Sequence, residues 1–68
     1  MLGYVKKSNV LEIIKRERDL NFDMYERYID IVNTATDDDF RTAYTNLAAD
    51  AFSSYQECCH LISKIEKL

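Results

Sequence analysis

The residues of this chain that could do chemistry are concentrated in the run Glu57, Cys58, Cys59 and His60. Thiol and imidazole groups bind metals or act as nucleophiles only when several of them converge on one point. If the run is helical, successive side chains point about 100° apart, so Cys58, Cys59 and His60 cannot chelate one ion. The better supported interpretation is that Cys58 packs as a small apolar residue.

A carboxylate site in a helical bundle is a second hypothesis. Glu57 and His60 have the Glu-x-x-His spacing of di-metal centres, and Glu17 interrupts an apolar stripe where a second copy could add another carboxylate. The chain has a single histidine, which gives this hypothesis little support. The alternative is that Glu17 and Asn21 form a polar layer that fixes helix register, or a stretch where the helices splay apart.

The acidic run Asp37, Asp38 and Asp39 is a third candidate. Calcium would need further oxygen ligands at alternating positions and a glycine, and this loop lacks both. The run is typical of a helix start, with Thr36 as the cap and Asp39 returning to its backbone N–H. Because no nucleophile with a positioned base can be named, we expect a non-enzymatic protein without a metal or cofactor.

Two rows of apolar residues at helical spacing flank this acidic run. Each row advances by four and three residues in alternation, the spacing that keeps one stripe of a helix against a partner helix. With no proline and only Gly3 as glycine, the chain has nothing that breaks either helix. The positions that we predict to form core or interface are Val10, Ile14, Met24, Tyr28, Ile31, Phe40, Tyr44, Leu47, Ala51, Cys58, Leu61 and Ile65.

These patterns predict an all-α fold, a single domain formed by an antiparallel hairpin of two long helices. We expect residues 1–7 to form an extended arm, with Ser8 or Asn9 capping the first helix. The first helix should cover about residues 9–34 and the second about residues 37–67. A break near Asn21, which would divide the first helix, remains the alternative.

The size of the chain favours a second copy. A chain of 68 residues buries only about 60% of its unfolded surface, and its two adjacent cysteines cannot form a disulfide framework. Further apolar residues lie outside both rows, so the chain has more apolar surface than one helix pair can bury. We therefore expect two hairpins to dimerise into a four-helix bundle.

Charge is distributed unevenly along the chain. Residues 1–18 carry five basic and two acidic residues, whereas residues 19–50 carry eight acidic and two basic ones. A hairpin would then have one basic and one acidic end, which favours antiparallel self-association. The overall acidity argues against duplex DNA as a partner. Without an apolar span or leader, and with free thiols, we expect a cytoplasmic protein that does not enter membranes.

The start of the chain contains the run Tyr4-Val5-Lys6-Lys7-Ser8-Asn9-Val10-Leu11-Glu12-Ile13-Ile14. An aromatic, a β-branched residue, a lysine pair and a capped amphipathic helix in this order resemble the start of small proteins from phages and mobile elements of Gram-positive gut bacteria. The resemblance implies a bacterial or phage accessory protein and carries no functional residue with it.

Three functional hypotheses follow. The leading one is a helical-hairpin module for protein–protein interaction and oligomerisation, with a host protein as a further partner. A second is a phage-type regulator that blocks a nucleic-acid-binding enzyme by mimicking phosphates with Asp30, Asp37, Asp38 and Asp39. A third is an oligomer that binds a small ligand in a pocket at a subunit interface, lined by Tyr25, Tyr28, Tyr44 and Tyr55.

Overall fold

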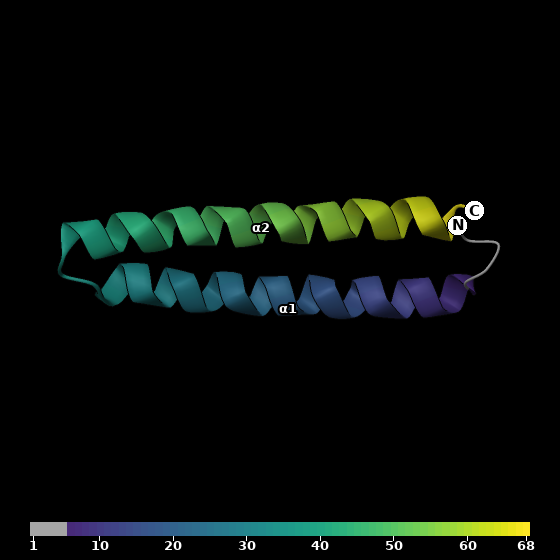
Figure 1. The fold of residues 1–68 in the computed structure, drawn as a ribbon, viewed down its shortest axis with the longest axis horizontal. Helices are drawn as coiled ribbons and strands as arrows, with labels where there is room; N and C mark the ends of the chain where they lie inside the picture. The colour runs from purple at the N-terminus through teal and green to yellow at the C-terminus, as the bar shows by residue number, and fades with distance from the viewer. Residues whose placement is uncertain (1–5) are drawn as a thin grey trace.

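The computed structural model describes residues 6–68, which form two long α-helices joined by a short turn (Figure 1). Helix α1 spans Lys7–Thr34 and helix α2 spans Asp38–Glu66. The helices lie side by side and antiparallel, and the longest extent of the hairpin is 50 Å. The predicted all-α hairpin is confirmed. The first five residues of the predicted arm lie outside the described residues.

Helix α1 begins two residues earlier than the capping pattern predicts. Lys6 is extended, and its carbonyl accepts from the backbone N–H groups of Asn9 and Val10 at 2.9 and 3.2 Å. No side chain caps this end, so the prediction that Ser8 or Asn9 caps the helix is wrong. Both residues lie inside the first turn, and the difference of two residues is within the range by which helix ends commonly vary.

The polar stretch at the middle of α1 does not break the helix. The Asn21 side chain donates a hydrogen bond of 2.8 Å to the Glu17 carbonyl one turn earlier. This bond stays within the helix, and the backbone is α-helical from Lys7 to Thr34. The alternative of two shorter helices is therefore wrong.

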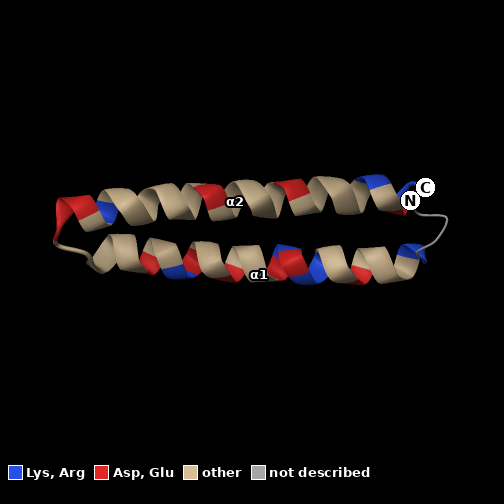
Figure 2. Ribbon diagram, in the orientation of Figure 1, with Lys and Arg blue, Asp and Glu red and all other residues tan. Residues whose placement is uncertain are grey.

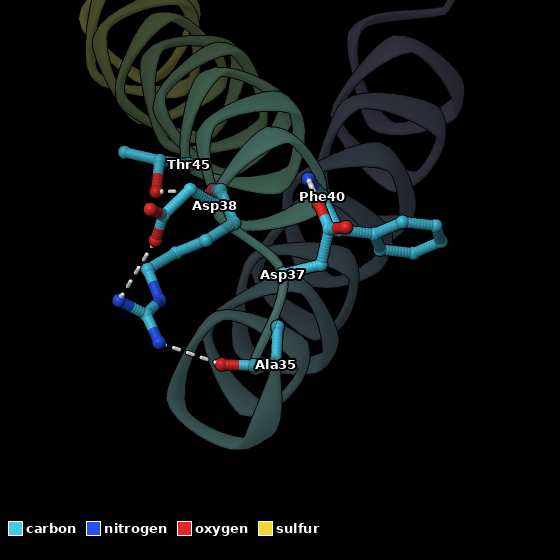
Figure 3. Close-up of polar contacts among 6 residues, drawn as sticks. Ala35, Asp37, Asp38, Phe40 and Thr45 are labelled. Carbon is cyan, nitrogen blue, oxygen red and sulfur yellow. Dashed lines mark hydrogen bonds and ion pairs between the residues drawn. The ribbon is translucent and has the colours of Figure 1, made fainter.

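The start of α2 is fixed by Asp37, one residue after the predicted cap Thr36. The Asp37 carboxylate accepts from the Phe40 backbone N–H at 3.0 Å (Figure 3). Phe40 occupies the third helical position, so Asp39 cannot close a capping box. Arg41 ties the turn together, because its guanidinium donates to the Ala35 carbonyl at 2.7 Å and pairs with Asp38 at 3.8 Å.

The contact between the helices uses a stripe of α2 that is rotated from the predicted one. The buried residues among those described all belong to α2, and none belongs to α1. They are Ala48, Ala51, Cys58, Ile62 and Ile65.

The predicted α2 row thus faces α1 only in part. Ala51, Cys58 and Ile65 are shared by both rows, but Phe40, Leu47 and Leu61 remain 56%, 41% and 42% exposed. Ala48 and Ile62 are buried against α1 in place of Leu47 and Leu61. Each lies one residue further along α2 and is therefore rotated by about 100° around the helix. Phe40, Leu47 and Leu61 are thus largely exposed in the single hairpin, and their assignment to a core or interface stays a prediction.

The cap assignment makes a direct prediction. Replacing Asp37 with alanine removes the acceptor for the Phe40 N–H and should lower the free energy of unfolding by about 1 kcal/mol. Thr36→Ala is the matched control and should change it by much less. Urea unfolding followed by circular dichroism, at one fixed protein concentration, measures both; equal effects would contradict the assignment.

Candidate functional site

A shallow hollow shows which residues of the two helices share a side of the hairpin. It lies at mid-length and is lined by Asn21, Met24, Tyr28, Leu47, Asp50, Ala51 and Ser54. Met24 of α1 and Leu47 of α2 therefore face the same side. Residues seven positions apart in packed helices lie nearly above one another, so the stripes through Met24 and Leu47 extend along this side.

We call this side the apolar face. Its α1 stripe contains Val10, Met24 and Ile31, which are half-buried. Ile13 and Leu20 lie beside that stripe, at its outer edge, and are 52% and 60% exposed. Its α2 stripe contains Phe40, Leu47, Leu61 and Leu68, all exposed. The remaining predicted core residues, Ile14, Tyr28 and Tyr44, are half-buried between the two stripes.

Aromatic rings from both helices pack against one another on the opposite side of the hairpin, where Phe22 remains 38% exposed. Phe22 and Tyr25 of α1 pack against Tyr55 and Phe52 of α2, with ring centroids 5.1 and 5.0 Å apart. Pairs at this separation contribute about 0.5–1.5 kcal/mol beyond the area they bury. The two sides therefore differ: aromatic pairs cross the hairpin on this side, whereas Leu47 and Leu61 on the apolar face stay more than two-fifths exposed.

The apolar face is interrupted by polar residues only near its middle. Glu17 is exposed on the α1 stripe, and Ser54 takes the place of a large apolar residue on the α2 stripe. Asn21 and Asp50 line the hollow beside Ser54. The predicted polar layer of Glu17 and Asn21 is thus joined by Ser54 and Asp50, which the sequence analysis did not assign because they come from the other helix.

The two ends of the hairpin carry opposite charge (Figure 2). At the terminal end, Lys15 pairs with Glu66 at 3.8 Å, while Lys64 and Lys67 form no ion pair with the described residues. At the turn end, Asp30 and Asp39 are exposed and form none within residues 6–68. Asp37 and Asp38 are held by the Phe40 N–H and by Arg41. Two of the four aspartates that were predicted to mimic phosphates therefore already have partners within the turn.

Cys58, Cys59 and His60 follow one another on α2 and are buried, half-buried and exposed, respectively. Burial, and then the nearby Glu17 carboxylate, raise the pKa of the Cys58 thiol and favour its unreactive protonated form. Cys59 is half-buried, and its side chain raises the pKa of the Tyr55 hydroxyl one turn before it. Within residues 6–68, no three histidine, cysteine or acidic side chains are placed to share a metal ion.

The tyrosines do not gather around one pocket. Tyr28 lines the hollow, whereas Tyr25 and Tyr55 lie on the opposite, aromatic side. Tyr44 packs against Tyr28 and stacks on Phe40, with centroids 5.8 and 5.3 Å apart. Only one of the four tyrosines proposed to line a ligand pocket therefore faces the hollow.

The two thiols should differ in reactivity. At pH 8, Cys59 should be alkylated by iodoacetamide before Cys58, because Cys58 is only 8% exposed and its raised pKa lowers the fraction of thiolate. Raising the pH should narrow the difference as Cys58 ionises. Mass spectrometry of the native protein, with urea-unfolded protein as the control, measures both rates. Faster labelling of Cys58 would contradict this placement.

Over residues 6–68, neither helix combines the length and the apolar character needed to cross a bilayer. Comparison of the chain with protein-family models, with curated proteins and with solved structures finds no match.

Proposed function

We propose that this protein is a non-enzymatic interaction module whose apolar face binds a second copy of the chain, giving a four-helix bundle. The observation that supports this most directly is the exposure of the α2 stripe. Leu47 and Leu61 are more than two-fifths exposed on a side that already includes half-buried Met24 and Ile31. Large apolar side chains exposed along one side of a protein are typical of interaction surfaces.

The exposed area of the chain supports the same proposal. The chain exposes 5322 Å², whereas a compact monomer of 8.0 kDa would expose about 4,450 Å². A hairpin that is one helix pair thick has little interior, so a larger share of its apolar side chains stays in contact with water.

The centre of the apolar arc on α2 also fits a bundle. The middle of this arc is the line of Tyr44, Ala51, Cys58 and Ile65. Ala48 and Ile62 on one flank of that line are buried against α1, and Leu47 and Leu61 on the other flank are exposed. A helix with one partner needs one flank, whereas a helix in a four-helix bundle packs against two neighbours and uses both.

A charge on the exposed flank should separate the copies. Leu47→Asp places a carboxylate in the proposed interface of each copy, which should weaken dimerisation by at least roughly 100-fold. Sedimentation equilibrium should give twice the 8.0 kDa mass for the wild type and a single 8.0 kDa mass for this variant.

Ala49→Asp is the matched control. Ala49 is exposed two residues later on the same helix, and about 200° around it from Leu47, so the charge should stay in water and the dimer should persist. A wild-type chain that is folded and monomeric at 100 μM would refute the proposal. So would a Leu47→Asp variant that dimerises as tightly as Ala49→Asp.

A further inference from the structure

We infer that the two copies lie antiparallel, with the turn of each against the terminal end of the other and the two-fold axis passing through the mid-length hollow. This inference rests on the proposed dimer and adds its orientation and register. The orientation follows from charge and the register from the position of the polar residues.

Charge separates the two possible orientations. The turn end carries the exposed carboxylates of Asp30 and Asp39, and the terminal end carries the ammonium groups of Lys64 and Lys67 (Figure 2). In a parallel pair, the two acidic turn ends would lie beside each other, as would the two basic terminal ends, and like charges repel. In an antiparallel pair, the acidic end of each copy lies beside the basic end of the other.

The polar residues select the register within that orientation. A two-fold axis perpendicular to the helices brings only the mid-length level of each copy against itself. That level contains Asn21, Ser54 and Asp50, which line the hollow. Sliding one copy by seven residues would place the polar Asn21 and Ser54 against the levels of Tyr28 and Leu47. Polar side chains would then lie against apolar ones, and their amide and hydroxyl groups would lose water without gaining hydrogen-bond partners.

The hollow itself fits this position. It is open toward the apolar face because Ala51 and Ser54 are small where Leu47 and Leu61 are large. Centred on the axis, the hollows of the two copies face one another. The amide of Asn21 and the hydroxyl of Ser54 then reach partners or shared water across the interface, as buried polar groups require.

Distance measurement between spin labels at the turn tests the orientation. The label is attached through Thr36→Cys in a Cys58→Ala, Cys59→Ser background. In the antiparallel dimer, the two labels should lie near opposite ends of a particle whose hairpins are 50 Å long. A parallel dimer would bring them to well under half that distance and would overturn the inference.

A label at Ser53→Cys in the same background is the control. Ser53 lies at mid-length on the surface of α2 away from the hollow, so both orientations give a distance set by the width of the bundle. If the labels at Ser53 give a distance and the labels at Thr36 give a short one, the proposed dimer is supported and its antiparallel orientation is refuted. If neither position gives a distance, the proposed dimer itself fails.

Filling the gap in the α2 stripe tests the polar layer. Ser54→Leu completes the exposed row of Phe40, Leu47, Leu61 and Leu68, and it should tighten the dimer by roughly tenfold while relaxing its register. A second or broadened distance between Thr36 labels would report the relaxed register. Ser53→Leu, one residue away on the outer surface, should change neither. A single unchanged distance in Ser54→Leu would refute the role of the polar layer.

Discussion

Two helices packed side by side can each turn only one stripe toward the other, and this limit determines the rest of the structure. Because α1 has no residue that is fully buried, the core of the hairpin consists of five residues of α2. Two of these are alanines, Ala48 and Ala51, which permit close approach of the helices but remove little apolar area from water. The larger buried side chains, Ile62 and Ile65, lie toward the terminal end. The half of the hairpin near the turn therefore depends on other contacts.

Those other contacts are aromatic and local. Tyr28 and Tyr44 pack across the helices near the turn, and Arg41 and Asp37 satisfy backbone groups of the turn itself. Such contacts hold the two helices in register, but they do not cover the side chains on the apolar face. A hairpin held in this way has a defined shape and an incomplete core. That combination is the physical basis for proposing an oligomerisation module, rather than an enzyme or a carrier of a small ligand.

The fold could be predicted from the sequence because the helical periodicity is long and no proline interrupts it, whereas the facing stripe could not. Residues 44, 51, 58 and 65 belong equally to a row through Leu47 and Leu61 and to a row through Ala48 and Ile62. Hydrophobicity favours the first row because leucine is more apolar than alanine. Packing within the hairpin uses the second, since small residues let the helices approach closely. A sequence pattern describes how wide an apolar arc is, but it does not specify which neighbour covers each flank.

Helix boundaries were predicted less well, for a related reason. Thr36 and Asp37 can both cap α2, and the backbone path of the turn decides between them. At the other end, Ser8 and Asn9 have good capping side chains, yet the helix extends past them to Lys7. Polar residues also occur on the apolar face, where Asn21 of α1 and Ser54 of α2 lie among apolar residues. A stripe of leucines alone would associate more strongly and in several registers. In the proposed dimer, polar groups at one level would lower the affinity of every mismatched pairing more than that of the matched one, so the partner arrangement would be defined at some cost in strength.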